Sequence, residues 1–223
     1  MIHQFIFAAP KPGLSTEAFA SYWLNFHAPD YASKIPQIRR YLVATPLPLD
    51  TGRDVPGFAG AAEIWLEADE QIASLQSPEF LQGARADEPR WAAFWQTLAL
   101  DTDAVVLTGE PEPPPGSAYA KLYGLLKRAP DLTREVFRER LLADRAGGAR
   151  ADRHLIGFCR DGLYGLGEPR FDAVEVLGFS DAAALRAALD GGLRERLSAG
   201  RPFLHPAYRF GFAAQEHWVI RSR

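Results

Sequence analysis

The sequence predicts an α+β fold built from two ferredoxin-like repeats, each with the element order β-α-β-β-α-β. Short apolar runs typical of strands alternate with helical patterns, a proline-rich segment divides the chain near its middle, and the two halves align with each other. Helices cover only one face of such a sheet, so the other face also needs cover. We therefore expect the two sheets to pack face to face within the chain, around either a solid core or a ligand cavity.

Four strands are expected in the first half, at residues 2–8, 40–45, 61–66 and 104–108. The first predicted helix covers residues 15–27, where the Ser15 hydroxyl can cap the first turn and Trp23 lies on an aromatic inner face. Pro29 is expected to end this helix, because the residue before a proline avoids the α conformation. A second helical region begins at Asp69.

The second half repeats this order, with strands expected at residues 120–126, 153–158, 173–178 and 217–220 and helices at 133–144 and from 181 onward. The alignment of the halves pairs Trp23 with Leu141, His27 with Arg145, Tyr41 with His154, and Glu63 with Glu175. Only the first copy has the histidine, so we expect one site rather than two equivalent sites. Residues 201–212 look irregular, and the glycine-rich residues 162–167 are expected to form a hairpin loop.

The proline-rich segment at residues 110–117, EPEPPPGS, is predicted to be a stiff, extended linker. Consecutive prolines lack backbone N–H groups and cannot continue a helix or a central strand. We therefore place the first repeat at residues 1–109 and the second at residues 118–223.

Composition narrows the class of protein. The chain has 223 residues, a net charge of -3 and a pI of about 6.0, so it lacks the basic excess typical of proteins that bind nucleic acid or anionic membranes. No apolar run approaches the ~20 residues of a membrane helix, and the N-terminus does not resemble a signal peptide. Cys159 is the only cysteine, which suits a cytoplasmic location.

Several short motifs occur in a fixed order along the chain. They are Trp23, His27-Ala28-Pro29, Ile35-Pro36, Glu63-Ile64-Trp65-Leu66, Ser77-Pro78-Glu79-Phe80 and Glu216-His217-Trp218-Val219-Ile220. This ordered set resembles the EthD family, strongly over residues 1–109 and more weakly over residues 118–223. The resemblance implies a dimeric α+β barrel, here formed by two repeats of one chain, with a small-molecule cavity. Proteins with that fold include cofactor-free monooxygenases, lactone isomerases, polyketide cyclases and haem-handling proteins.

His27 is the first candidate catalytic residue, because an imidazole near neutral pKa can remove a proton from an activated carbon or a phenol. The alternative is a histidine that only stabilises a helix end. Glu63 and Tyr41 are candidates to orient that proton or the substrate. Glu63 alternates in phase with Trp65 and therefore shares its sheet face, but it also suits a purely structural ion pair.

Candidate substrate-binding residues come from both halves and share the ability to stack on a ligand or to polarise one of its oxygen atoms. They are Trp23, Trp65, His3, Tyr123 and His154. Each is also explained as an ordinary core or rim residue, because aromatic side chains dominate protein interiors.

No cofactor is expected from the motifs in the sequence. Five scattered histidines and one cysteine give no metal-ligand spacing, and no glycine-rich nucleotide-binding motif is present. Haem stays open, since His27, His154 or His217 could supply an axial ligand.

The favoured function is cofactor-independent acid–base chemistry, such as oxygenation, isomerisation or dehydration, on an aromatic, phenolic or lactone compound. An alternative is a non-catalytic binding or accessory protein with the same cavity, and a third is a structural pseudo-dimer with a filled interior. The expected partner is a small organic ligand, with no nucleic acid and no membrane. The sequence leaves open whether the internal pseudo-dimer pairs again as a homodimer.

Overall fold

The structure is a computed structural model that describes residues 1–54, 57–110, 119–147 and 151–221. The chain forms two compact units. Unit 1 contains Met1–Pro46, Gly57–Asp101 and Glu216–Arg223, and unit 2 contains Leu47–Pro56 and Thr102–Gln215. The units do not coincide with the two predicted repeats, because unit 1 includes Glu216–Arg223 from the second half and unit 2 includes Leu47–Pro56 from the first. The predicted repeat boundaries stay a prediction. The predicted linker lies outside the described residues apart from Glu110.

Unit 1 contains an antiparallel sheet in which β3 (Gly60–Leu66) lies between β1 (Ile2–Ala8) and β2 (Arg40–Leu47). The register places Ile64 opposite both Gln4 and Tyr41. Two long strands, β4 (Leu98–Thr108) and β8 (Leu204–Ile220), contribute residues to both units.

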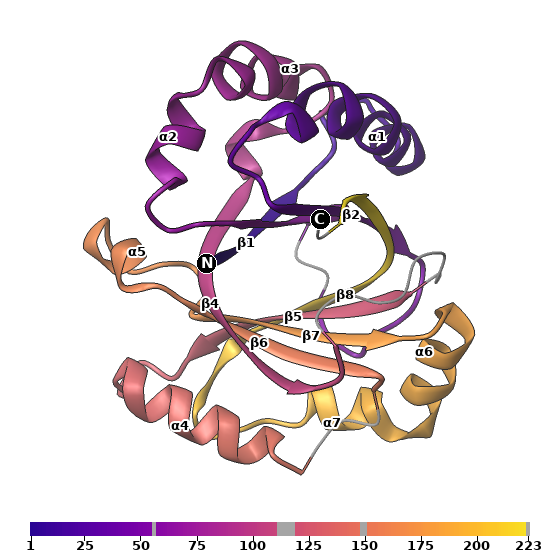
Figure 1. Ribbon diagram of the computed structural model, residues 1–223. Helices are drawn as coiled ribbons and strands as arrows, with labels where there is room; N and C mark the ends of the chain where they lie inside the picture. The colour runs from indigo at the N-terminus through magenta and orange to yellow at the C-terminus, as the bar shows by residue number, and fades with distance from the viewer. Residues whose placement is uncertain (55–56, 111–118, 148–150, 222–223) are drawn as a thin grey trace. The chain divides into compact units, whose positions relative to one another are not determined.

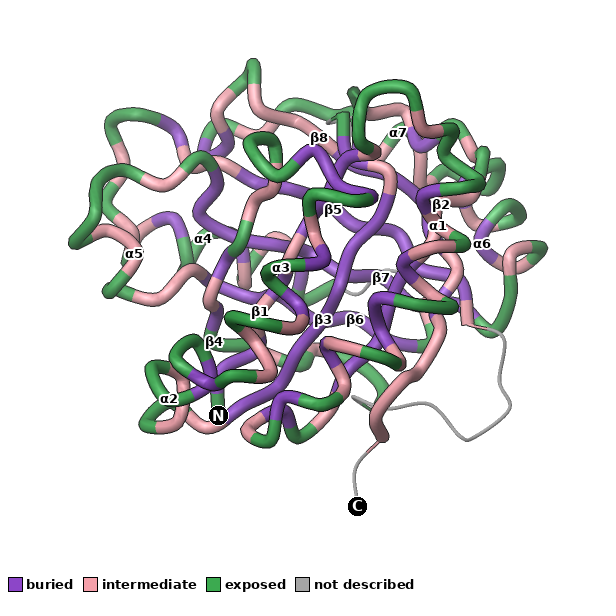
Figure 2. The backbone as a smooth tube through the Cα atoms, turned by 90° about the horizontal axis from the view of Figure 1, so that it is seen from above, coloured by how far each residue is buried: buried purple, intermediate pink, exposed green. Residues whose placement is uncertain are grey.

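The two faces of this sheet have different neighbours, because side chains alternate along a strand. Tyr41, Ala62 and Ile64 belong to the core cluster that includes the helical residues Phe19 and Trp23. Every residue of β3 is buried, and Figure 2 shows this strand as a continuous buried stretch. The helix-facing side is therefore a packed aromatic and aliphatic layer.

The first helix of unit 1 starts as predicted and ends later than predicted. α1 (Thr16–Tyr22) begins at Ser15, whose Oγ accepts a hydrogen bond from Ala18 N at 3.1 Å. It then continues as a π-helical segment, Trp23–Tyr31, that contains Pro29. The predicted stop at Pro29 is wrong, because π-helical i to i+5 bonding changes which carbonyl group faces the proline ring. His27 consequently lies inside a helical segment rather than at its exit.

A 3-10 turn, Ala32–Lys34, follows the π-helical segment, and the other helical segments of unit 1 come after β3 and are short. They are α2 (Gln71–Gln76), the π-helical Glu79–Ala84, α3 (Arg85–Asp87) and the 3-10 turns Glu88–Arg90 and Phe94–Gln96. Prolines interrupt this region, since Pro78 precedes one piece and Pro89 lies in another. Figure 1 shows α1, α2 and α3 on the same face of the unit 1 sheet.

Unit 2 contains an antiparallel sheet with the strand order β4-β6-β7-β5-β8. Its remaining elements are β5 (Ala120–Arg128), α4 (Arg134–Arg145), β6 (Arg153–Cys159), α5 (Asp161–Gly165), β7 (Ala173–Phe179), α6 (Ala182–Ala188), the π-helical Leu189–Leu193 and α7 (Arg194–Ser198). One prediction is wrong here, because most of residues 201–212 belongs to β8. Residues 162–167 lie in the hairpin connection between the antiparallel strands β6 and β7, as expected, but this connection also contains the short helix α5.

A buried charge network lies between α4 and the sheet of unit 2. Arg145 Nε and Nη2 donate to the two carboxylate oxygens of Glu175 at 2.6 and 3.1 Å, and His154 Nε2 lies 3.0 Å from Glu175 Oε1. Burial alone would raise the pKa of Glu175, but the hydrogen bond from His154 and the charge and hydrogen bonds of Arg145 hold it well below its usual range. Glu175 is therefore a permanently ionised structural group.

The predicted pairing of Glu63 with Glu175 is wrong, because the two carboxylates face different sides of their sheets. Glu175 accepts hydrogen bonds from Arg145 of α4 and therefore faces the helices of unit 2. In unit 1, Ala62 packs on the helix side, so its neighbour Glu63 points to the other side.

We predict that Arg145→Met lowers the free energy of unfolding by about 3–5 kcal/mol, because it leaves the buried Glu175 carboxylate without its main counter-charge. Adding Glu175→Leu to that variant should restore most of the loss, since the buried charge is then gone. Urea denaturation measures both values, with the exposed pair variant Arg194→Met as a control. Equal losses in the single and double variants would contradict this.

Candidate active site

His27 and Asp87 form a buried hydrogen-bonded pair in unit 1. His27 comes from the π-helical segment and Asp87 from the end of α3, and their Nδ1 and Oδ2 atoms are 3.0 Å apart. The exposed fractions of the two residues are 5% and 2%. A carboxylate only accepts hydrogen bonds, so Nδ1 carries the proton and donates it to Asp87. Nε2 then has a free lone pair, and it forms no hydrogen bond with any residue the structure describes.

Other groups hold the Asp87 carboxylate in place. Tyr22 Oη donates to Asp87 Oδ1 at 2.9 Å, and Arg90 Nη1 lies 3.6 Å from the same oxygen. Proximity to this carboxylate and burial raise the pKa of Tyr22, with burial the larger effect. Asp87 therefore receives one donor on each oxygen, a geometry that fixes the orientation of the His27 ring.

The His27 ring lines a cavity of about 60 Å³ between the unit 1 sheet and its helices. Most of its walls are apolar or aromatic, and the polar side chains that reach it are few. The lining residues are Ile6, Ala8, Trp23, His27, Ala32, Ile35, Tyr41, Ala62, Ile64, Phe80, Ala84, Glu88, Trp91, Ala92 and Thr97. A mostly apolar wall with a few polar groups is typical of small-molecule sites, but the volume is below the roughly 300–1,000 Å³ of pockets for drug-sized ligands, so this cavity holds only the reacting end of such a compound.

Burial shifts the ionisation of the groups around this cavity. It lowers the pKa of His27, although the hydrogen bond and the charge of Asp87 act in the opposite direction. It raises the pKa of Glu88, partly offset by Arg85, whose Nη1 donates to Glu88 Oε2 at 2.9 Å. It also raises the pKa of Tyr41. At neutral pH, His27 is thus a neutral base and Tyr41 a neutral phenol.

Three aromatic side chains form the wall behind His27. The Trp91 ring lies 4.7 Å from the His27 ring and 4.9 Å from the Trp23 ring, measured between centroids. Trp23 Nε1 donates to Tyr41 Oη at 3.2 Å. Trp91 Nε1 is also buried, but it has no hydrogen-bond acceptor within the described part of the chain.

The predicted site residues of the first half separate into two groups. His27, Tyr41 and Trp23 line one cavity, as described above. Glu63, His3 and Trp65 lie on the opposite face of the sheet, where Glu63 Oε2 is 2.8 Å from His3 Nε2 and the His3 ring stacks on Trp65 at 4.2 Å. The expectation that Glu63 orients His27 is therefore wrong, because strand alternation turns it away.

The two predicted residues of the second half lie in unit 2. The Tyr123 ring stacks on Phe212 at 5.2 Å, and His154 is bonded to Glu175 in the charge network. A role for either in ligand binding stays a prediction.

Sequence reasoning missed Asp87, Glu88 and Trp91 as site residues. The run Asp87-Glu88-Pro89-Arg90-Trp91 looks like an ordinary charged helix end followed by a core aromatic. Asp87 is 60 positions from His27, so no local spacing connects the pair. The only available signal was the cluster of prolines and tryptophans after the second helical region.

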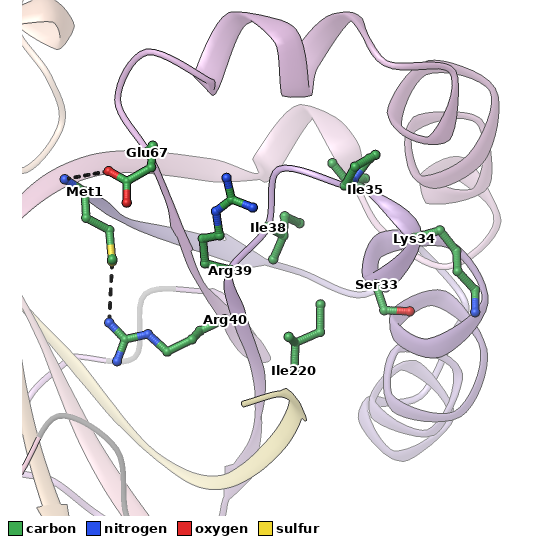
Figure 3. Close-up of a pocket in the computed structure, with 10 residues that line it drawn as sticks. Met1, Ser33, Lys34, Ile35, Ile38, Arg39, Arg40, Glu67 and Ile220 are labelled. Atoms are coloured by element: carbon green, nitrogen blue, oxygen red, sulfur yellow. Dashed lines mark hydrogen bonds and ion pairs between the residues drawn. The ribbon is translucent and has the colours of Figure 1, made fainter. Parts of the chain in front are cut away.

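A larger groove of about 990 Å³ lies in the same unit (Figure 3). Several of its charged groups contact one another or neighbouring residues. The Met1 ammonium is 3.4 Å from Glu67, Arg40 Nη2 donates to Met1 Sδ at 3.5 Å, and Arg39 donates to Glu70 at 2.6 and 2.7 Å. Acid–base chemistry is therefore better supported at the smaller cavity.

The three candidate axial histidines do not fit haem within the units as described. The cavity beside His27 is about 60 Å³, whereas pockets for drug-sized ligands span roughly 300–1,000 Å³. Nε2 of His154 is bonded to Glu175, and Nε2 of His217 is 2.9 Å from Thr45 Oγ1.

Among the described residues, no cluster of three or more His, Cys, Asp or Glu side chains is arranged to hold a metal ion. No helix within the described ranges is long and apolar enough to cross a membrane.

Residues 11–94 match the model of the EthD domain, which confirms the expected resemblance for this part of the chain. These residues include His27, Asp87 and Trp91. Among curated protein sequences, none matches the chain.

The fold is similar to those of solved structures over nearly the whole chain. A putative monooxygenase from Fusobacterium nucleatum has 8% identity and a TM-score of 0.56, with 98% of this chain and 91% of that one covered. An anthrone oxidase-like protein has 11% identity and a TM-score of 0.59, covering 100% and 94%. A mutant chlorite dismutase from Candidatus Nitrospira defluvii has 11% identity and a TM-score of 0.51, covering 98% and 92%. At these identities, the similarity shows the fold alone.

We predict that the free energy of unfolding falls as the pH is lowered through about 6.5, and that His27→Gln weakens this dependence. The pKa of His27 is lowered in the folded state, so protonation below the unfolded value of about 6.5 favours the unfolded chain. Urea denaturation between pH 8 and pH 5 measures the effect, with His205→Gln as a histidine control. An unchanged pH dependence in His27→Gln would contradict the lowered pKa.

Proposed function

We propose that the protein is a small-molecule enzyme of the EthD type in which His27 moves a proton on an aromatic, phenolic or lactone compound. The observation that supports this most strongly is the buried His27–Asp87 pair at 3.0 Å, on the wall of a mostly apolar cavity inside the EthD domain. Pairs of this kind recur where a histidine serves as a general base.

The proposed chemistry begins with transfer of a proton from the ligand to His27 Nε2. The electron pair of the broken C–H or O–H bond stays on the ligand, and the imidazolium that forms is stabilised by the Asp87 carboxylate at Nδ1. His27 then returns the proton at another position in an isomerisation, or to a leaving hydroxyl group in a dehydration. In an oxygenation, dioxygen would instead react with the electron-rich anion.

Three further residues have proposed supporting roles. Tyr41, held by Trp23 through a hydrogen bond of 3.2 Å, presents a neutral phenol that can orient a ligand oxygen. Glu88 lines the same cavity with a raised pKa, so it can exchange a proton closer to neutral pH than an ordinary glutamate. The apolar walls limit water, which strengthens each of these interactions.

We also propose that the chain is a tandem of two EthD-like repeats that form a barrel of the dimeric α+β type. The element order supports this, because β1-α1-β2-β3-α2-β4 is followed by β5-α4-β6-β7-α6-β8 when the short helical turns are set aside. In this proposal, Arg145 and Glu175 occupy in the second repeat the positions of His27 and Ala62, so the second copy has an ion pair where the first has its cavity.

We predict that His27→Gln lowers kcat at least about 10²-fold, the typical contribution of general acid–base catalysis. A panel of phenols, quinols and lactones is screened by oxygen uptake and by mass spectrometry of products, and the variant is compared with wild type on any compound that is converted. The wild-type rate should fall on the acid side with an inflection below pH 6.5, because only neutral His27 accepts a proton.

His205→Gln, a histidine variant in unit 2, should keep wild-type turnover. Unchanged turnover in folded His27→Gln would remove His27 from the mechanism. Ligand binding by wild type without conversion of any compound would support the alternative of a binding or accessory protein.

A further inference from the structure

We infer that Tyr22 is a positioning residue that weakens His27 as a base, by donating its hydroxyl hydrogen to the far oxygen of the Asp87 carboxylate. This inference rests on the proposed function, because it concerns the same imidazole. It adds a residue that does not line the cavity. It also narrows the reaction class, since a weaker base returns its proton more readily, and isomerisation and dehydration both require that return.

A chain of two hydrogen bonds connects the surface of unit 1 with the buried imidazole. Tyr22 Oη donates to Asp87 Oδ1 at 2.9 Å, and Asp87 Oδ2 is 3.0 Å from His27 Nδ1. Asp87 and His27 are buried, whereas Tyr22 is half-buried. The two oxygens of one carboxylate thus receive different donors, and linked hydrogen bonds polarise one another, so a change at Oδ1 is felt at Oδ2.

The donor at Oδ1 changes how strongly the carboxylate favours a protonated ring. An ionised carboxylate beside an imidazole stabilises the imidazolium. A hydrogen bond donated to that carboxylate disperses part of its negative charge, so the imidazolium is stabilised less. Burial lowers the pKa of His27, and the hydrogen bond and charge of Asp87 oppose this effect. The Tyr22 hydroxyl reduces the opposition, so His27 stays neutral to a lower pH.

Packing holds the Tyr22 hydroxyl at this position. The Tyr22 ring lies 5.4 Å from the Phe26 ring and 6.4 Å from the Trp91 ring, measured between centroids. The Trp91 ring also packs on the His27 ring at 4.7 Å, so one indole supports both ends of the chain. Burial and the Asp87 carboxylate raise the pKa of Tyr22, so its hydroxyl keeps the hydrogen that it donates.

Other ionisable groups near the pair have effects that can be told apart. Arg90 Nη1 is 3.6 Å from Asp87 Oδ1, so its positive charge also disfavours the imidazolium, but its side chain is exposed and salt screens it. The Glu88 carboxylate acts in the opposite direction, and its charge is offset by Arg85, which donates to it at 2.9 Å. Tyr41 has a raised pKa and adds no charge at neutral pH.

The test follows the titration of the His27 ring by NMR in the full chain, at low and at high salt. Its midpoint in wild type should lie below 6.5. Tyr22→Phe removes only the hydroxyl group and should raise the midpoint by about half to one pH unit at both salt concentrations, the effect expected of one hydrogen bond. Arg90→Gln should raise it by less, and only at low salt.

Tyr31→Phe is the matched control. The Tyr31 ring lies 6.3 Å from the His27 ring, and its hydroxyl forms no hydrogen bond with any residue the structure describes. This variant should leave the midpoint unchanged. On any compound that wild type converts, the acid limb of the rate profile of Tyr22→Phe should move upward by as much as the ring titration. A substitution that only loosened the site would lower the rate at every pH without moving that limb.

An unchanged midpoint in Tyr22→Phe would overturn the inference, and so would an equal shift in Tyr31→Phe. Turnover that depends on His27 together with either result would leave the proposed function intact and reject only the role of Tyr22. A shift specific to Tyr22→Phe, in a protein that converts no compound, would support the effect of Tyr22 on His27 and reject the catalytic function.

Discussion

The hydrogen bond between His27 Nδ1 and Asp87 Oδ2 is the interaction on which the candidate site depends. It connects two helical segments that are 60 residues apart, and both partners are nearly inaccessible to solvent. Without the carboxylate, a buried imidazole would have no fixed tautomer and no stabilisation after gaining a proton. With it, Nε2 keeps a free lone pair on a ring that lines the cavity, and burial lowers the pKa of His27 so that the ring is neutral at neutral pH.

The π-helical segment from Trp23 to Tyr31 makes this interaction possible. An α-helix would have been disrupted at Pro29, and the change in hydrogen-bond spacing lets the helical path continue past that residue. Segments of this type occur frequently at functional sites, where they redirect a side chain that regular geometry would point elsewhere. Here the segment contributes Trp23, His27 and Ala28 to the buried side.

The two units fill the space between helix and sheet in different ways. In unit 2, the Arg145 guanidinium and the Glu175 carboxylate neutralise each other, and His154 completes the network. In unit 1, the helix-facing side of the sheet carries Ala62, a small side chain that lines the cavity beside His27. A buried ion pair therefore fills this space in unit 2, whereas a histidine beside an apolar cavity occupies it in unit 1.

The strands and the first helix were predictable because their apolar periodicity is local. The eight predicted strands occur in the expected order, and the Ser15 hydroxyl caps the first turn of the first helix, as the sequence predicts. The site was only partly predictable. Trp23 and His27 come from recognisable motifs and Tyr41 from a predicted strand, but Asp87 and Trp91 lie in an irregular stretch of short helical turns. Their roles follow from tertiary contacts, and the orientation of Glu63 depended on a register that the sequence does not fix.

The central claim is that His27 is a neutral base whose single ring proton is held by Asp87. The 15N chemical shifts of the His27 ring at neutral pH test this most directly, because they distinguish a protonated from an unprotonated ring nitrogen. The account predicts a protonated Nδ1 and an unprotonated Nε2. Protonation at Nε2, alone or together with Nδ1, would contradict it, because the lone pair that faces the cavity would then be absent.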